Sequence, residues 1–260
     1  MMIVDWQPRP VVGDGPVAIA LSHSLCADSS FSCDQISLLA KARQLLPVPR
    51  TLLLVGSVAG WRMPSCSIAE NPLGGSATVR AWLATGHGTT ARQAGPVFYH
   101  MVRSAVEELV IEFGGIGGRE SSYDPMARLV MSVQSFVPAD VSVTATVERP
   151  GGPVRLRAHR GLDDDLGGRP ERDVLVFSWP RLSVLRHEVH HQTFATVAAD
   201  GGTRMIAVPP RLRDRPAMPV TRARAIARAC ARLAERLDAG LEFEIAVRAG
   251  SPYLLSCQRA

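Results

Sequence analysis

Residues 129–161 read LVMSVQSFVPADVSVTATVERPGGPVRLRAHRG. The opening apolar run is typical of a buried strand, and residues 141–147 alternate small and β-branched side chains as strands do. The PAD sequence at 138–140 favours a turn between these two strands. The PGGP sequence at 150–153 favours a second turn, which leads into a short strand at 154–158. The stretch therefore predicts an antiparallel β-unit with tight turns.

Outside this stretch, apolar patterns predict both strands and helices, so we expect an α+β fold. Residues 96–113 carry apolar side chains four apart, from Val97 to Phe113, which is typical of an amphipathic helix. A short helix is expected at 77–84, and residues 184–197 alternate like a strand. Further strands are expected at 17–22, 51–58, 174–178, 241–246 and 253–259, and further helices at 35–46 and 221–237.

The composition is that of a folded globular protein, with 46% hydrophobic and 20% charged residues. The net charge of +5 is carried by arginine, because Lys41 is the single lysine. These arginines are spread among acids, whereas a nucleic-acid-binding protein clusters its positive charge. The sequence therefore argues against a nucleic-acid partner.

Neither an export signal nor a membrane span is expected. No run of about 18 apolar residues, the length that a transmembrane helix needs, occurs in the sequence. The five cysteines are odd in number and irregularly spaced, which favours reduced thiols over a disulfide framework. We expect a cytoplasmic protein without a membrane partner.

Two carboxylates lie two residues apart on the strand expected at 241–246. Because side chains alternate along a strand, Glu242 and Glu244 point to one face, and Phe243 and Ile245 point to the other. Paired carboxylates suit Mg²⁺, which prefers oxygen ligands and often bridges nucleotide phosphates. The same spacing is typical of a solvated strand face, and spacing alone favours that alternative.

The sequence His187-Glu188-Val189-His190-His191 satisfies the H-E-x-x-H pattern of zinc proteases. That chemistry needs a helix, which places both histidines on one face with the glutamate as general base. The surrounding residues alternate like a strand, so a chance match is the better interpretation. A zinc hydrolase is kept as a remote alternative, and the three histidines could also bind a metal or another substrate.

Several short patterns together resemble the nucleotide-binding domain of phosphoenolpyruvate synthase, pyruvate phosphate dikinase and rifampicin phosphotransferase. They are the VQ-x-hydrophobic-V sequence at 133–137, the ADVS sequence at 139–142, GLDDD at 161–165, LEFEIA at 241–246 and YLLSCQR at 253–259. Their order and spacing match over residues 129–259. The resemblance implies an ATP-grasp-like fold of two subdomains with mostly antiparallel sheets. Residues 1–128 would form a shortened N-terminal subdomain, and residues 129–260 the C-terminal one.

The resemblance also implies ATP and Mg²⁺ as cofactors and a set of residues that bind them. The backbone of the strand that includes Gln134, Phe136 and Val137 would pair with adenine. An acid at Asp164 would approach ribose or metal, and Glu244 with Glu242 would hold the metal. The sequence departs from the family at Leu21 and Ser256, where the related enzymes carry an arginine and a glutamine.

The related enzymes transfer phosphate from ATP to a histidine on a separate domain. The resemblance therefore implies an ATP-dependent phosphotransferase, acting on a phosphohistidine-carrier or acceptor protein or on a small-molecule substrate. The missing family residues favour a second hypothesis, a degenerate module that has lost phosphoryl transfer. Such a pseudoenzyme would serve as a binding subunit or as a repurposed biosynthetic protein.

Overall fold

The computed structural model describes residues 17–21, 34–57, 76–85, 88–98, 104–111, 128–163, 171–199 and 202–260. The chain forms two compact units, one from Met1–Ser37 and Arg50–Phe136, the other from Leu38–Pro49 and Val137–Ala260. Strand pairing is antiparallel throughout the described residues. The expected α+β class, with two subdomains and mostly antiparallel sheets, is confirmed. The subdomain limits expected at 1–128 and 129–260 stay a prediction.

The first unit contains a five-stranded sheet in the order β1-β2-β5-β3-β4. Its strands are β1 (Val17–Ala20), β2 (Thr51–Ser57), β3 (Ser76–Thr85), β4 (Gly88–Phe98) and β5 (Arg128–Ser135). The central strand β5 is buried from Leu129 to Gln134 and pairs with β2 and β3 on either side. A helical segment at 104–111 also belongs to this unit, and α1 (Asp34–Ala42) runs from this unit into the second.

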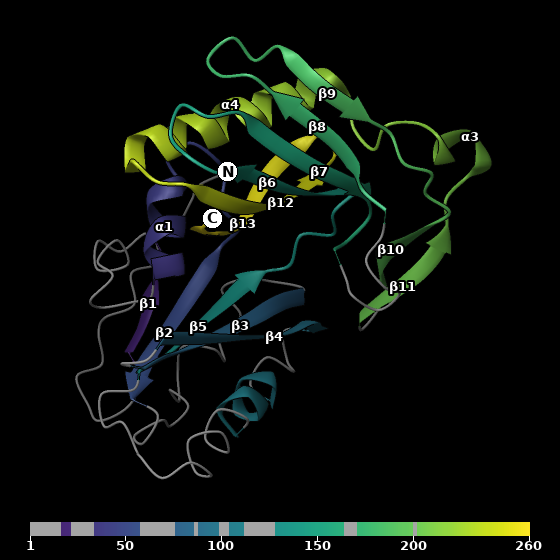
Figure 1. Cartoon of the computed structure of the whole chain (residues 1–260). Coiled ribbons are helices and arrows are strands. Elements are labelled where there is room, and N and C mark those ends of the chain that lie inside the picture. The colour runs from purple at the N-terminus through teal and green to yellow at the C-terminus, as the bar shows by residue number, and fades with distance from the viewer. Residues whose placement is uncertain are drawn as a thin grey trace, which may run out of the picture. The chain divides into compact units, whose positions relative to one another are not determined.

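The second unit contains a six-stranded sheet in the order β13-β12-β6-β7-β8-β9, shown in Figure 1. A separate hairpin and two helices complete it. The sheet consists of β6 (Val141–Val147), β7 (Val154–Arg160), β8 (Asp173–Phe177), β9 (Val184–Glu188), β12 (Leu241–Arg248) and β13 (Ser251–Arg259). The hairpin is β10 (Phe194–Ala199) with β11 (Gly202–Ala207), and the helices are α3 (Pro210–Arg213) and α4 (Val220–Leu237).

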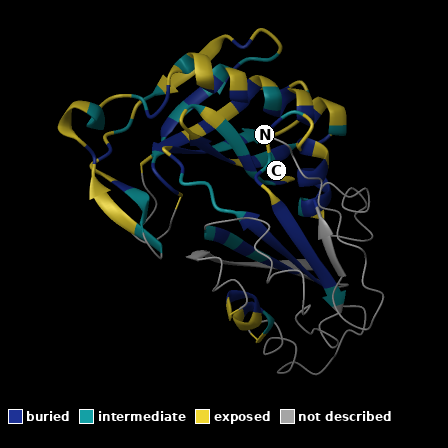
Figure 2. Ribbon diagram, turned by 180° about the vertical axis from the view of Figure 1, so that it is seen from behind, coloured by how far each residue is buried: buried dark blue, intermediate teal, exposed yellow. Residues whose placement is uncertain are grey.

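Helix α4 covers one face of this sheet and encloses the core of the second unit. Its buried side chains recur three and four residues apart, from Ala223 to Ala234, whereas its arginines lie mainly on the exposed side. It packs against β6, β7, β8 and β12. Figure 2 shows the helix as exposed along its outer side and buried where it meets the sheet. Because α4 covers only one face, polar side chains collect on the other.

Most elements expected from the sequence are present. The strand patterns at 51–58, 141–147, 154–158, 174–178, 241–246 and 253–259 are confirmed by β2, β6, β7, β8, β12 and β13. The strand expected at 17–22 is confirmed by β1, and the helices expected at 35–46 and 221–237 are confirmed by α1 and α4. The stretch at 184–197, which alternates like a strand, holds β9 and the start of β10, and residues 189–193 between them form neither strand nor helix.

Three expectations are wrong. Residues 77–84 form strand β3 and not a helix, because Ala77, Val79 and Ala81 are buried between β4 and β5. In the segment 96–113, strand β4 continues to Phe98, and the described helix covers only 104–111. Strands β5 and β6 belong to different sheets, so residues 129–147 do not form a hairpin, whereas β6 and β7 do.

No helix among the described residues is long and apolar enough to cross a membrane. Two cysteines lie in the described residues, Cys230 in α4 and Cys257 in β13, and both are buried free thiols. Burial raises the pKa of both thiols, that of Cys257 to about 12. The remaining cysteines, Cys26, Cys33 and Cys66, fall outside the described residues.

Candidate functional site

The register of the six-stranded sheet aligns the two predicted carboxylates with threonines and arginines. Glu244 lies opposite Thr144 of β6, which lies opposite Arg157 of β7. One step along the strands, Glu242 lies opposite Thr146, which lies opposite Arg155. Because neighbouring strands are about 4.8 Å apart, the acidic and basic backbones are separated by about 10 Å, with the threonines between them.

Burial shows that these side chains share the face of the sheet opposite α4. In β12, Phe243 is fully buried while Glu242 is half-buried and Glu244 is exposed. In β7, the residues that flank the arginines are buried, and both arginines are exposed. We call this surface, made of Glu242, Glu244, Thr144, Thr146, Arg155, Arg157 and Arg172, the polar face. The expectation that Glu242 and Glu244 point the same way is confirmed.

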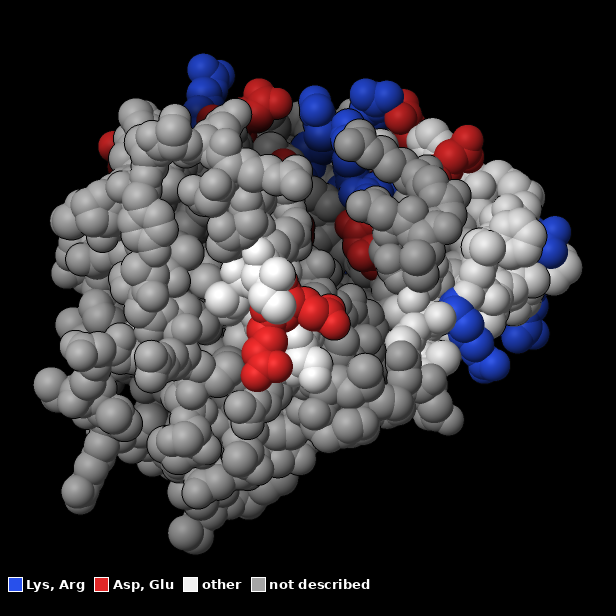
Figure 3. All heavy atoms as spheres, turned by 90° about the horizontal axis from the view of Figure 1, so that it is seen from below, with Lys and Arg blue, Asp and Glu red and all other residues white. Residues whose placement is uncertain are grey.

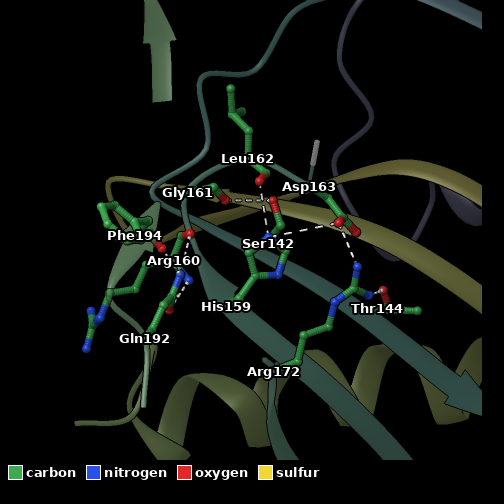
Figure 4. A network of polar contacts seen from close by, with 10 residues as sticks. All are labelled: Ser142, Thr144, His159, Arg160, Gly161, Leu162, Asp163, Arg172, Gln192 and Phe194. Carbon is green, nitrogen blue, oxygen red and sulfur yellow. Dashed lines mark hydrogen bonds and ion pairs between the residues drawn. The ribbon is translucent and has the colours of Figure 1, made fainter. Parts of the chain in front are cut away.

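Arg172 brings a third guanidinium onto the polar face, just before β8 begins. Its Nη1 donates to Thr144 Oγ1 over 3.1 Å, and its Nη2 donates to Asp163 Oδ1 over 2.7 Å, as Figure 4 shows. Since Thr144 is the cross-strand partner of Glu244, this cation lies one strand away from the carboxylate. The polar face therefore holds the guanidinium of Arg172 at a fixed position.

Strand β13 continues the polar face beyond the carboxylates. Gln258 lies opposite Glu242 and donates from Nε2 to Glu242 Oε1 over 3.0 Å. Ser256 lies opposite Glu244. The amide fixes the half-buried Glu242 side chain, and the second carboxylate oxygen of Glu242 still has lone pairs for another ligand.

His159 lies at the β7 end of the polar face and is buried, with 3% of its surface exposed. Its Nε2 lies 3.1 Å from the carbonyl oxygen of Leu162 and 3.9 Å from Asp163 Oδ1. Burial lowers the pKa of His159, and the Asp163 carboxylate opposes that effect. A neutral ring that donates from Nε2 keeps a lone pair on Nδ1, which is buried without a hydrogen-bond partner among the described residues.

Gly161 lies close to the backbone of Thr196 in the β10–β11 hairpin, beside this end of the sheet. It has a φ of +85°, and a Cβ at this position would overlap the carbonyl of Thr196 in β10. The next amide, that of Leu162, donates to the same carbonyl over 2.8 Å. A side chain at position 161 would therefore meet both backbone strain and a fixed backbone atom.

We expect Gly161→Ala to lower the free energy of unfolding by roughly 2–4 kcal/mol, measured by urea denaturation. The matched control is Gly151→Ala, because Gly151 also has a positive φ, of +72°, but has no atom within 4 Å of the added Cβ. The control should lose only the strain, about 1 kcal/mol. Equal losses in the two variants would show that the contact with Thr196 contributes nothing.

The residues predicted to bind adenine lie around the end of β5. Gln134 is buried, and its Nε2 donates to Thr51 Oγ1 over 3.2 Å. Phe136 is half-buried, and its amide donates to the carbonyl of Ser76 over 3.0 Å, so this donor is already satisfied within the first unit. Val137 is half-buried in the segment that leads to β6. Their role in binding adenine stays a prediction.

Asp164 falls outside the described residues. Its neighbour Asp163, which the sequence did not single out, is the acid that pairs with Arg172. The loop after Gly161 therefore contributes the Asp163 carboxylate beside the polar face, and the role expected for Asp164 stays a prediction.

The H-E-x-x-H segment does not form a metal site of the zinc-protease type. His187 and Glu188 are in strand β9, and His190 and His191 follow outside any helix or strand, so no helical face collects them. His191 Nδ1 lies 2.6 Å from Asp214 Oδ1. In the part of the chain that the structure describes, no group of three His, Cys, Asp or Glu side chains could hold a metal ion.

Sequence reasoning found the carboxylates of the polar face but missed its cations. Arg155 and Arg157 are two apart on a strand whose other residues are apolar, and that alternation is a signal that they share an exposed face. Nothing in the sequence, however, shows that β7 lies two strands away from β12. Figure 3 shows arginines beside acids on the described part of the surface in view, so charges of both signs are interspersed.

A scan of protein-family models and a search of curated proteins find no match to this sequence. Two solved structures of D-alanine–D-alanine ligase from Bacillus anthracis are similar to the chain. The ligase complexed with ATP aligns with 12% identity and a TM-score of 0.41, covering 92% of this chain and 55% of its own. The other aligns with 12% identity and a TM-score of 0.38, covering 92% and 58%. The chain spans less than two thirds of either ligase, and likeness at these scores assigns no function.

Proposed function

We propose that the polar face binds a magnesium-complexed nucleoside triphosphate such as ATP, in an ATP-grasp-like fold. The observation that carries the proposal is the position of Arg172, whose guanidinium is bonded to Thr144, the cross-strand neighbour of Glu244. A fixed cation and a pair of carboxylates on one face of the sheet match the two parts of such a ligand. The resemblance of residues 129–259 to nucleotide-binding domains supports the same proposal.

The donor set fits Mg²⁺ bound through a nucleotide better than a resident metal ion. Mg²⁺ is usually held by one or two carboxylates while phosphates and water fill its other positions. Glu244, with Glu242 beside it, would hold the ion, which would neutralise phosphate charge. Arg157, Arg155 and Arg172 would hold the phosphate oxygens, since a guanidinium binds phosphate with several donors at once.

The arginine that holds phosphate need not come from the start of the chain. Leu21, where the resembling enzymes have an arginine, is a buried apolar residue with 5% of its surface exposed. In contrast, the described residues show no hydrogen bond or ion pair that occupies the exposed guanidinium of Arg157 or Arg155. The polar face thus offers cations to compensate for this departure.

For the reaction, we propose transfer of a phosphoryl group from ATP to a partner histidine or a small-molecule acceptor. The buried Leu21 favours a second candidate, a binding subunit that retains the nucleotide site and has lost transfer. The two differ in turnover, because only the first should release ADP when an acceptor is present. If the chain binds nucleotide but forms no ADP with any acceptor tested, the result would support the binding subunit.

We expect calorimetric titration of the full chain to show that Mg²⁺ strengthens the binding of ATP. Glu244→Gln should weaken binding about tenfold, and only in the presence of Mg²⁺, because the substitution removes a metal ligand. Arg157→Gln should weaken binding by a similar factor, roughly tenfold, with or without Mg²⁺, because it removes a phosphate contact.

The matched controls are Glu148→Gln and Arg149→Gln, which remove exposed charges at the β6–β7 turn outside the polar face. Both should bind nucleotide like the unaltered chain. Absence of binding at millimolar ATP and Mg²⁺ would contradict the proposal. Equal weakening by the control variants would also contradict it, because the effect would then be one of net charge.

A further inference from the structure

Strand β9 is an edge strand with an unusual amount of exposed apolar surface. It is the last strand of the six-stranded sheet, and among the described residues only β8 pairs with it. Leu185 is 62% exposed, Val184 is 40% exposed, and Val189, the residue after the strand, is 39% exposed. Exposed apolar edges are normally blunted or covered, because they pair readily with other strands.

The outer backbone of β9 is free to accept another strand. Apart from the pairing with β8, the described residues make no hydrogen bond to the backbone of Val184–Val189. The strand contains no proline or glycine, and its register irregularity lies near its start, between the partners of Val176 and Phe177. From Arg186 onward the edge is regular and can therefore extend the sheet.

The charges on β9 limit which strand can pair with it. Arg186 and Glu188 are two apart and share one face, where Arg186 Nε and Nη2 donate to the two Glu188 carboxylate oxygens over 2.6 Å each. An incoming strand must place an acid opposite Arg186 and a base opposite Glu188, since like charges directly opposite one another are destabilising. A strand without such charges would place no opposite charge across from Arg186 and Glu188.

A second copy of β9 satisfies this condition by symmetry. Two identical strands can pair antiparallel about a two-fold axis that passes through one residue position. That residue then faces the same residue of the other copy, and the residue before it faces the residue after it in the other copy. With His187 at the axis, Arg186 of each copy lies opposite Glu188 of the other. Leu185, at the register irregularity of β9, and Val189, just after its end, flank these three positions, so exposed apolar side chains lie at both ends of the pairing. Centring the axis on Arg186 or Glu188 would instead oppose like charges.

We propose that β9 is a homodimerisation strand, which pairs antiparallel with β9 of a second copy of this chain about His187. The pairing joins the two six-stranded sheets edge to edge and arranges four charges in alternating order. Each copy contributes one Arg186–Glu188 pair. Because a single strand buries a small area, the association is of the weak, concentration-dependent class.

Sedimentation velocity of the full chain over a concentration series at low salt tests the proposal. The expected result is a monomer–dimer equilibrium that shifts toward monomer as salt is added. Arg186→Glu and Glu188→Arg should each raise the dissociation constant by about tenfold or more, since each opposes like charges twice across the axis. The double variant R186E/E188R should dimerise like the unaltered chain.

A mixture of the two single variants gives the sharpest result. Arg186→Glu makes both positions acidic and Glu188→Arg makes both basic, so the two variants complement each other and should form a heterodimer when mixed. A purely structural effect of either substitution cannot produce this recovery. Arg149→Glu, at an exposed turn of the same unit, serves as the matched charge reversal and should leave the equilibrium unchanged.

Two results would overturn the proposal. One is a monomer at every accessible concentration of the unaltered chain. The other is a dimer that neither single substitution weakens, which would place the contact elsewhere. Circular dichroism of each variant shows whether it is folded, and the heterodimer test keeps the proposal falsifiable if one variant is less stable on its own.

Discussion

Asp173→Ala is expected to lower the free energy of unfolding by about 3–5 kcal/mol, because the substitution breaks a buried charged network. Asp173 opens β8 and is only 5% exposed. Its Oδ1 accepts the amide of His190 over 2.9 Å, and its Oδ2 accepts the amide of Ala217 over 2.6 Å. One carboxylate thus ties two separate segments to the start of the strand.

The same carboxylate balances a partly buried cation on the neighbouring strand. Arg160 in β7 donates from Nη2 to the carbonyls of Leu212, Arg215 and Pro216, at 3.3, 3.0 and 2.9 Å. Burial lowers the pKa of Arg160, and the charge of Asp173 opposes that effect. Removing Asp173 therefore leaves two amides without their acceptor and a partly buried guanidinium without its counter-charge.

Urea denaturation of Asp173→Ala, Asp173→Asn and a matched control would measure this effect. Asp214→Ala is the control, because it also removes an aspartate that pairs with the same segment, through His191, but is exposed. The control should change stability by less than about 1 kcal/mol. Asp173→Asn should fall between the two, since it keeps one acceptor and loses the charge. Equal effects at positions 173 and 214 would contradict the network.

The second large effect is expected for Phe243→Ala, which should lower the free energy of unfolding by about 3–5 kcal/mol. Phe243 has no exposed surface and occupies the middle of β12, between β13 and β6. The cavity left by the ring cannot collapse easily, because paired strands on both sides hold the backbone in place. The core under the polar face would then lose one of its largest side chains.

The matched control for this substitution is Phe194→Ala, which removes the same ring from a position in β10 that is 55% exposed. It should cost less than about 1 kcal/mol when both variants are compared by urea denaturation. If the two phenylalanine variants lost similar amounts, the interior of the second unit would not be packed as described.

The success of the sequence reasoning depended on whether a pattern was local. In β12 the alternation of LEFEIA with burial is local, so the strand and the shared face of Glu242 and Glu244 were predictable. In β3 the residues SATVRAWLAT also alternate, but their alanines and leucine suit a helix equally well. Pairing with both β4 and β5 settles the strand. β4 follows β3 directly along the chain, whereas β5 is distant in the sequence.

The cations of the polar face show the same limit. Arg172 follows residues outside the described ranges and reaches Thr144 through a contact across 28 positions of the chain. Arg155 and Arg157 become neighbours of the carboxylates only through the order β12-β6-β7, which strand patterns do not specify. The sequence resemblance supplied the acids, whereas the arginines depend on tertiary register.

The path of the chain between its two units has a consequence for how the protein can be divided. Residues 38–49 belong to the second unit although they interrupt the first, and Pro47 there accepts the amide of Leu254 in β13 over 2.8 Å. A single cut near position 136 would therefore release a C-terminal fragment that lacks part of its own unit. No one break in the polypeptide yields two complete pieces, so neither unit is a module that gene fusion or limited digestion can transfer alone.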